Sequence, residues 1–350
     1  MKNPIKFHLL RFLQKHLDPK RPVLLGLSGG NDSTALFYLL LEVQNEQSQL
    51  KSGTAFKFGI AHIDHGWRKE SSFQASQLKN LSAEHGIPFH LKSLDHDPKL
   101  KNLEAKCREE RLFFFKELCN EWSYQAVILA HHLDDQAETV LKNIFEGAAL
   151  CYCNGIAERM KINDLEIWRP LLSFQKKQLS ASIQTKQFQP FIDETNEDCK
   201  FLRARMRKEI LPHLEGLFGK GIKQSLASHG NEAQELKNFI ETHLEKILNN
   251  CRSSEIGTLI DLTPYHPLTL FEIKCLIRQV CEKENCLPSK KIIHSAATQL
   301  LSRSSNKEYI MGKHHLYVDR LRLFVSSDKV LNSKETSCTK KISMIINNIT

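Results

Sequence analysis

Residues 23–41 read VLLGLSGGNDSTALFYLLL, which is an apolar run, a glycine-rich turn and a second apolar run. The first run is typical of a buried strand, and the composition of the second favours a helix. A strand, a glycine-rich turn and a helix in this order bring backbone N–H groups and a helix N-terminus together on an anion, most often a phosphate. The segment Ser28–Ser33 therefore predicts a phosphate-binding loop in an α/β domain.

The residue types in this loop suit a phosphate ligand. Gly29 and Gly30 let the backbone approach the ligand without a Cβ in the way. The hydroxyls of Ser28 and Ser33 are hydrogen-bond donors, and Asp32 can hold Mg²⁺ beside phosphate oxygens. The loop lacks the Gly-Lys-Ser/Thr ending of a Walker A motif. The alternative is a glycine-rich turn that binds no ligand.

Strands and helices are expected to alternate through the N-terminal part of the chain. The expected strands are residues 23–27, 53–63, 89–94 and 126–130, and the expected helices are residues 5–17, 34–41, 72–85 and 103–122. This alternation predicts an α/β fold with a doubly wound parallel sheet that is covered on both faces. In such sheets, ligands bind at the carboxyl ends of the strands, near a change in strand order.

The alternation ends near Leu214, where Gly216, Gly219 and Gly221 indicate a boundary. The following part is expected to contain helices at 222–249, 268–286 and 292–302 and a hairpin at 309–325. We therefore expect a nucleotide-binding catalytic domain at 1–215, a smaller and mainly helical domain at 222–326 and a polar tail at 327–350.

Composition limits the classes of partner and compartment. The net charge of +9 favours a polyanionic partner, although a basic enzyme without one is the alternative. Ten cysteines at irregular spacings, without a Cys-x-x-Cys motif, argue against a zinc ribbon, an iron–sulfur site or a disulfide scaffold. No stretch approaches about 18 apolar residues, and no signal peptide is recognisable. We expect a cytoplasmic protein that does not act on a membrane.

A second group of polar residues, HHLDDQAET at 131–139, follows the apolar run 126–130. Asp134 or Asp135 can cap the helix that is expected to start here. The spacing of His131, Asp135 and Glu138 places all three on one helical face. Two carboxylates on one face can bind a cation, either a metal or an amine. The alternative is a solvated acidic helix start.

Three further groups are candidates for ligand contacts. Ala61 and His62 end the second expected strand, where they suit a nucleotide base, although a lone histidine there is more often packed or solvated. Arg111 recurs at helical spacing with other charges and can offer a planar donor fork to a carboxylate or phosphate; surface ion pairs are the alternative. Arg203 and Arg207 share one face of the helix that is expected after the segment 191–199. This basic face could hold the phosphates of RNA or of ATP, and a solvated basic face is the alternative.

Together these motifs resemble the tRNA(Ile)-lysidine synthases, a family of PP-loop ATP pyrophosphatases. The matching blocks are SGGNDS at 28–33, HIDHGWRKES at 62–71, EAKCREERLFFF at 104–115, LAHHLDDQAET at 129–139, IWRPLL at 167–172 and IDETNEDCKFLRARMRKEILP at 192–212. The region after residue 222 resembles the first C-terminal domain of the family. Departures are Leu112 in place of a tyrosine, Ala204 in place of an asparagine, and an altered glycine-rich segment at 147–155.

The resemblance implies a ligase that attaches free L-lysine to C2 of the wobble cytidine of the tRNA(Ile) with a CAU anticodon. The cytidine is first adenylated by ATP, with release of pyrophosphate, and lysine then displaces AMP. ATP and Mg²⁺ are the implied cofactors, and a homodimer is a possible assembly. The alternatives are another PP-loop enzyme that thiolates tRNA, which needs paired cysteines, or an inactive RNA-binding relative.

The resemblance also implies roles for individual residues. The implied ATP-binding residues are Ser28, Gly29, Gly30, Asn31, Asp32, Ser33, Ala61 and His62, with Asp32 as the Mg²⁺ ligand. The implied lysine-binding residues are Arg111, Asp135 and Glu138, and the implied catalytic residues are Asp32, His131, His132, Asp135 and Glu138. Arg203, Arg205 and Arg207 are implied to contact phosphates or tRNA.

Overall fold

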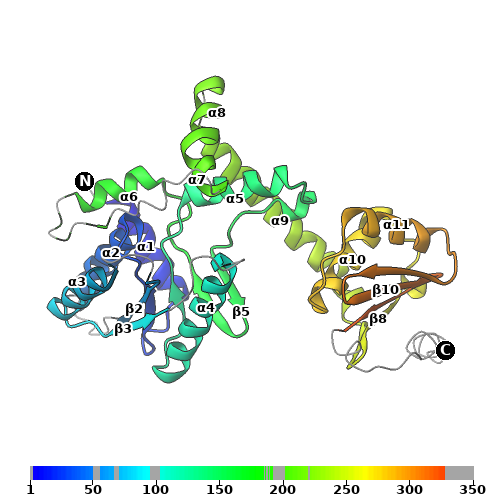
Figure 1. Cartoon of the computed structure of the whole chain (residues 1–350), viewed down its shortest axis with the longest axis horizontal. Coiled ribbons are helices and arrows are strands. Elements are labelled where there is room, and N and C mark those ends of the chain that lie inside the picture. The colour runs from blue at the N-terminus through cyan, green and yellow to red at the C-terminus, as the bar shows by residue number, and fades with distance from the viewer. Residues whose placement is uncertain are drawn as a thin grey trace. The chain divides into compact units, whose positions relative to one another are not determined.

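The chain forms two compact units, Met1–Gln234 and Glu235–Thr350 (Figure 1). The structure is a computed structural model that describes residues 3–49, 56–66, 71–94, 103–184, 186, 188, 190–191, 202–219 and 221–327. The division between the units falls inside α9 (Ile222–Leu248), later than the glycines at 216–221 where the sequence suggests a boundary. Nearly all of the tail expected at 327–350 lies outside the described residues.

The first unit contains a six-stranded sheet with the strand order β3-β2-β1-β4-β6-β5. The strands are β1 (Val23–Gly26), β2 (Phe58–Asp64), β3 (Phe89–Ser93), β4 (Val127–Ile128), β5 (Arg159–Ile162) and β6 (Leu165–Trp168). All neighbouring pairs are parallel except β5 and β6. The order runs outward in opposite directions from β1 and β4, which confirms the doubly wound sheet and places its ligand-binding edge at the end of β1.

Helices cover both faces of this sheet because its central strand is apolar on both sides. The helices of the first unit, besides the start of α9, are α1 (Pro4–His16), α2 (Asn31–Gln49), α3 (Ser71–Glu84), α4 (Leu103–Glu121), α5 (Leu133–Phe145), α6 (Lys176–Ile183), α7 (Leu202–Arg205) and α8 (Leu211–Phe218). Leu25 of β1 belongs to a core with residues of α1, α2, α3 and α6, whereas Leu24 belongs to a core with α4. Successive side chains of a strand point to opposite faces, so β1 needs both layers.

The hairpin of β5 and β6 is absent from the sequence expectations. Its turn residues Asn163 and Asp164 have φ values of 47° and 69°. Asparagine and aspartate tolerate this left-handed conformation and are typical of two-residue hairpin turns. The Asn-Asp pair between two short segments in which polar and apolar residues alternate, RMKI and LEIW, could therefore have identified the hairpin.

The second unit combines helices with a five-stranded antiparallel sheet of order β7-β8-β11-β10-β9. Besides the rest of α9, its elements are β7 (Arg252–Ser254), β8 (Gly257–Asp261), α10 (Leu270–Lys283), α11 (Lys290–Leu301), β9 (Lys307–Met311), β10 (His314–Asp319) and β11 (Arg322–Ser326). The three expected helices and the hairpin at Gly312 are present. β7 and β8 were not expected, and the unit contains more strand than the sequence suggests. Within the described ranges, no helix has the length and apolar character to cross a bilayer.

α10 begins with a capping box that makes a pH-dependent contribution to stability. The backbone N–H and the hydroxyl of Thr269 both donate to Glu272 Oε2 at 2.7 Å, and Glu272 N donates back to Thr269 Oγ1 at 3.2 Å. The side-chain and backbone hydrogen bonds from Thr269, together with His243, lower the pKa of Glu272. Because the pKa of Glu272 is lower in the folded state than in the unfolded chain, its charge stabilises the fold at pH values above the unfolded pKa. This contribution is lost as the pH falls through the folded-state pKa.

We expect Glu272→Gln to destabilise α10 by about 0.3–1 kcal/mol at neutral pH, because glutamine keeps the geometry of the capping box but loses the negative charge at the helix N-terminus. The difference from the original chain should shrink as the pH falls from about 5 to about 3, because the carboxylate itself becomes protonated there. Amide hydrogen exchange in α10 measures the effect. The matched control is Glu282→Gln, at an exposed position of the same helix, which should leave exchange unchanged. An equal effect of Glu272→Gln at neutral pH and at about pH 3 would contradict a contribution from the charged carboxylate.

Candidate functional site

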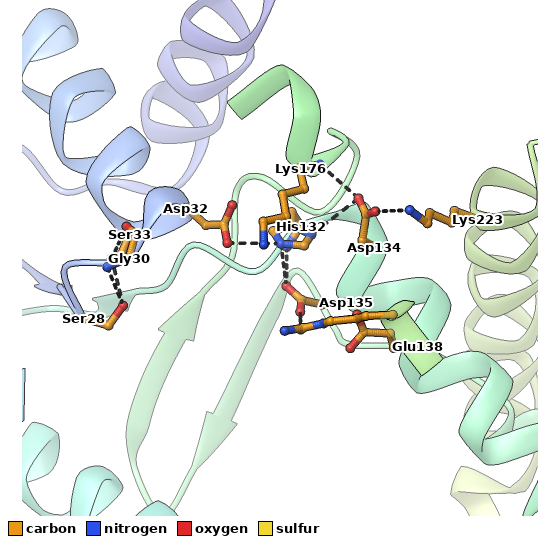
Figure 2. Close-up of polar contacts among 11 residues, drawn as sticks. Ser28, Gly30, Asp32, Ser33, His132, Asp134, Asp135, Glu138, Lys176 and Lys223 are labelled. Carbon is orange, nitrogen blue, oxygen red and sulfur yellow. Dashed lines mark hydrogen bonds and ion pairs between the residues drawn. The ribbon is translucent and has the colours of Figure 1, made fainter. Parts of the chain in front are cut away.

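The glycine-rich turn lies between β1 and α2, at the carboxyl edge of the sheet (Figure 2). Ser28 Oγ and Ser33 Oγ lie 3.0 Å apart, and Gly30 N donates to Ser28 Oγ at 3.4 Å. The Ser33 hydroxyl also contacts the Gly30 carbonyl oxygen at 3.1 Å. The two predicted hydroxyl donors are thus brought together at the N-terminus of α2, where backbone N–H groups lack helical partners.

Gly29 occupies a position that a larger residue cannot. Its φ is +85°, and a Cβ built there would lie 2.4 Å from the ring of Phe191. The Gly29 carbonyl oxygen accepts a hydrogen bond from Phe191 N at 2.9 Å. Phe191 therefore packs on the turn and fixes its course.

We expect Gly29→Ala to lower the free energy of unfolding by about 1–3 kcal/mol, the cost of holding a residue with a Cβ in a strained backbone region. Displacement of Phe191 adds to this cost and should also weaken nucleotide binding. Thermal unfolding with and without ATP measures both effects. Gly216→Ala is the matched control, because Gly216 lies in α8 with nothing within 4 Å of a built Cβ. A stable Gly29→Ala variant with normal ATP binding would contradict this role for the turn.

Ala61 and His62 are buried next to this turn. Leu27 N donates to the Ala61 carbonyl oxygen at 3.0 Å, and His62 Nδ1 donates to the Leu27 carbonyl oxygen at 2.8 Å. Burial lowers the pKa of His62, with a smaller opposing effect from the Leu27 hydrogen bond. The uncharged His62 therefore supports the segment that leads into the turn, and its contact with a nucleotide base stays a prediction.

His132 connects the turn to the acidic residues of α5 (Figure 2). Its Nε2 lies 3.4 Å from Asp32 Oδ2 and 3.5 Å from Asp135 Oδ2, and its Nδ1 lies 3.7 Å from Asp134 Oδ2. Burial alone would lower the pKa of His132, but the hydrogen bond to Asp32 and the three nearby carboxylates outweigh burial and raise it. The two motifs predicted from the sequence thus share one imidazole.

The start of α5 differs from the sequence expectation. His132 is the N-cap residue, and its backbone N–H donates to Asp135 Oδ2 at 3.0 Å. His131 precedes the helix, so the prediction that it shares a helical face with Asp135 and Glu138 is wrong. Burial lowers the pKa of His131 to about 4, despite the opposing charge of Asp135. His131 is therefore uncharged at neutral pH, and its Nδ1 is buried without a hydrogen-bond partner.

Asp134 is held by groups outside α5 rather than by the helix start. Lys223 Nζ lies 2.6 Å from its Oδ1, and Lys176 N donates to its Oδ2 at 2.9 Å (Figure 2). Burial alone would raise the pKa of Asp134, but these two contacts outweigh burial and lower it. Of the two aspartates that could cap α5, Asp135 does so, and Asp134 joins α5 to α6 and α9.

Arg207 binds the two acids that the sequence suggests for a cation. Its Nη2 lies 2.8 Å from Asp135 Oδ1, and its Nε donates to Glu138 Oε1. Glu138 is only 2% exposed, and its Oε2 is buried without a hydrogen-bond partner. Burial raises the pKa of Glu138, and Arg207 opposes this shift.

The position of Arg207 differs from the basic stripe expected with Arg203. The residues Met206–Ile210 form a π-helical turn, which changes the side-chain register that a continuous α-helix would give. Arg203 and Arg205 are exposed, whereas Arg207 is directed into the acid pair.

Several other arginines surround His131. The charges of Arg169, Arg111 and Arg203 each lower its pKa. Arg111 lies on the exposed side of α4. Arg169, which sequence reasoning missed as a site residue, is 5% exposed and donates to the Ala157 carbonyl oxygen at 2.8 Å. Burial and the neighbouring charges of Arg108 and Arg111 lower the pKa of Arg169 to about 10. Its place directly after β6, in the quoted block IWRPLL, could have identified it.

The described residues include no group of three or more His, Cys, Asp or Glu side chains that could hold a metal ion alone. Asp32 Oδ1 is nevertheless buried without a hydrogen-bond partner. Mg²⁺ commonly takes one or two carboxylates and completes its coordination with water and substrate phosphates. The Asp32 carboxylate at the phosphate loop therefore fits Mg²⁺ that arrives with a nucleotide.

Comparison with known proteins agrees with this geometry. The PP-loop domain family matches residues 1–214. The tRNA(Ile)-lysidine synthase of Protochlamydia amoebophila is 38% identical over 91% of this chain and 68% of its own length. The Chlamydia muridarum enzyme of the same name is 33% identical over 82% of this chain and 87% of its own length. A solved U34-tRNA thiolase, NcsA from Methanococcus maripaludis, shares the fold at a TM-score of 0.54 and 19% identity, over 66% of this chain and 78% of that one. The chain belongs to the tRNA(Ile)-lysidine synthase family and carries the family's ATP-binding PP-loop domain.

Proposed function

We propose that this chain attaches free L-lysine to C2 of the wobble cytidine in the tRNA(Ile) with a CAU anticodon, at the expense of ATP. The observation that carries the proposal is the bridge formed by His132. Its Nε2 lies 3.4 Å from Asp32 of the phosphate loop and 3.5 Å from Asp135 of the acid pair. A nucleotide on the loop and an amine at the acids would therefore lie next to each other.

In the first proposed step, the C2 carbonyl oxygen of the cytidine attacks the α-phosphorus of ATP, and the bond to pyrophosphate breaks. The N–H groups of residues 29–33 and the hydroxyls of Ser28 and Ser33 would hold and orient the phosphates. Asp32 would hold Mg²⁺, which supplies positive charge to the phosphate oxygens. Ala61 and His62, at the end of the neighbouring strand β2, would contact the adenine.

In the second proposed step, the ε-amine of lysine forms a bond to C2, and AMP leaves. Lysine arrives as an ammonium ion and must lose a proton before it can act as a nucleophile. Asp135 and Glu138 would attract the ammonium. Burial, although opposed by Arg207, raises the pKa of Glu138 and makes it a stronger base than an exposed glutamate. The uncharged His131 beside them is a second proton carrier.

The leaving AMP needs compensation for its negative charge. Arg111 and Arg203 lie close enough to His131 to lower its pKa, and both would contact the phosphate or the lysine carboxylate. Exposed Arg205 would contact the tRNA backbone, which agrees with the net charge of +9. A homodimer stays a prediction.

Incubation of the purified protein with ATP, labelled lysine and the CAU-anticodon tRNA tests the proposal. We expect one lysine per tRNA, located at the wobble cytidine after nuclease digestion, with one AMP and one pyrophosphate formed for each. A tRNA with uridine at the wobble position is the matched control and should accept no lysine. AMP formation that is independent of lysine, or label at another nucleotide, would contradict the assignment.

A further inference from the structure

The acid pair of Asp135 and Glu138 has four carboxylate oxygens, and three of them are already bound. Arg207 holds Asp135 Oδ1 at 2.8 Å and also binds Glu138 Oε1. Asp135 Oδ2 accepts the backbone N–H of His132 at 3.0 Å. Glu138 Oε2 is the remaining oxygen, and it is buried without a hydrogen-bond partner. A buried carboxylate oxygen without a donor is costly, which indicates that a positively charged ligand completes the site.

The charges at the site also indicate that a cation is missing. Four carboxylates meet at this site, those of Asp32, Asp134, Asp135 and Glu138. Lys223, Arg207 and His132 face them, so even with His132 protonated the cluster carries one uncompensated negative charge. One additional monovalent cation balances it. Glu138 is 2% exposed, and burial makes an uncompensated charge here more expensive than at the surface.

Buried residues that precede and follow Arg207 in the sequence hold its backbone in place. Met206 and Leu211, 3% and 1% exposed, pack with Leu141 of α5 in one buried cluster. The π-helical turn Met206–Ile210 carries Arg207 between these two anchors. Because α5 also carries the acid pair, the guanidinium and the carboxylates belong to one packed assembly. We therefore treat Arg207 as a permanent partner of the acids and not as an occupant that lysine displaces.

We propose that Arg207 determines the specificity of the amine site, by occupying one oxygen of each acid and leaving a single oxygen, Glu138 Oε2, for the substrate. An ammonium ion is a compact charge that one oxygen can bind, whereas a guanidinium group binds best through two parallel hydrogen bonds to paired oxygens. The site would thus accept free lysine and exclude free arginine. This inference rests on the proposed function, in which the acid pair receives the amine of lysine.

Arg207→Ala and Arg207→Lys test the inference. The measurements are the KM for lysine and the inhibition constant of L-arginine, both in the lysine-incorporation reaction with the CAU-anticodon tRNA. In Arg207→Ala we expect the ratio of the arginine inhibition constant to the lysine KM to fall about tenfold or more, since a charge-assisted hydrogen bond contributes at least that factor. Added guanidinium ion should raise this ratio again in the variant, because it refills the place that the arginine side chain leaves.

Arg207→Lys keeps the charge but occupies fewer carboxylate oxygens, so it should show a smaller fall in the same ratio. Arg207→Ala leaves Glu138 without a charge partner and can therefore fail to fold, which a thermal unfolding measurement detects. In that case Arg207→Lys still tests whether Arg207 sets the preference for lysine over arginine. Arg159→Ala is the matched control. Arg159 also pairs with a carboxylate, Glu166 at 2.6 Å, but lies in the β5–β6 hairpin, and its loss should change neither constant.

The outcomes separate this inference from the proposed function. If the original chain incorporates no lysine, the proposed function fails. If it incorporates lysine but both Arg207 variants keep the original ratio, only the role of Arg207 is overturned. A lower lysine KM in Arg207→Ala, with arginine inhibition unchanged, would instead show that lysine displaces Arg207, which also overturns it.

Discussion

Replacing Asp32 with asparagine is expected to slow pyrophosphate release by about 100-fold to 1000-fold, comparable to the loss of one preorganised charge-stabilising group at an active site. Asparagine keeps the shape of the side chain but removes the charge that suits Mg²⁺ at Oδ1, the oxygen without a partner. The variant also loses the ion pair with His132 at 3.4 Å. Pyrophosphate release with ATP and tRNA, measured over a range of Mg²⁺ concentrations, gives the rate and the metal dependence.

The matched control for this substitution is Asp164→Asn. Asp164 is an exposed aspartate, paired with Lys161 at 3.0 Å in the β5–β6 turn, and asparagine tolerates its left-handed backbone. This variant should release pyrophosphate at the original rate. An Asp32→Asn variant that retains the rate and the Mg²⁺ dependence would remove Asp32 from the proposed metal site.

Replacing Asp135 with asparagine is expected to slow lysine transfer by about 100-fold and to slow pyrophosphate release much less, because general acid–base and charge effects of this kind reach 10²-fold to 10⁴-fold. The asparagine oxygen can still accept the His132 N–H, which preserves the start of α5. The negative charge that pairs with Arg207 and attracts the ammonium is lost. Both products can be followed in the same reaction, by pyrophosphate release and by lysine incorporation.

Glu146→Gln controls for a general change in α5. Glu146 follows the last turn of that helix, where it pairs with Lys142 at 3.7 Å and is exposed. This variant should support both steps normally. Equal losses of adenylation and lysine transfer in Asp135→Asn would contradict the division of roles between the phosphate loop and the acid pair.

The parts of the fold that depend on neighbouring residues could be predicted from the sequence. The turn at Ser28–Ser33 is decided by its glycines and by the apolar runs beside it. The doubly wound sheet follows from the alternation of strands and helices. β8 was missed because it pairs with β11, about sixty residues later, as in Leu259 with Phe324. A short segment whose partner is distant gives little local indication of a strand.

The same distinction applies to the candidate site. The carboxylates of α5 were recognisable because they follow a buried strand within one short motif. The prediction that His131 lies on the same helical face as Asp135 and Glu138 was wrong because the helix begins only at Leu133. The hydrogen bond from His132 N to Asp135 sets this helix start. The contacts of Arg207 could not be predicted, because its two partners lie 69 and 72 residues earlier in the chain. The π-helical turn that directs it there has no simple sequence pattern.

The central claim is that a nucleotide at the glycine-rich turn lies next to an amine at the acid pair. A crystal structure of the protein with a non-hydrolysable ATP analogue, Mg²⁺ and lysine tests this claim most directly. We predict phosphate oxygens on the N–H groups of Gly29 to Ser33, Mg²⁺ on Asp32, and the lysine ammonium within hydrogen-bond distance of Glu138. An analogue bound elsewhere, or a lysine that binds away from Glu138 and Asp135, would contradict the account.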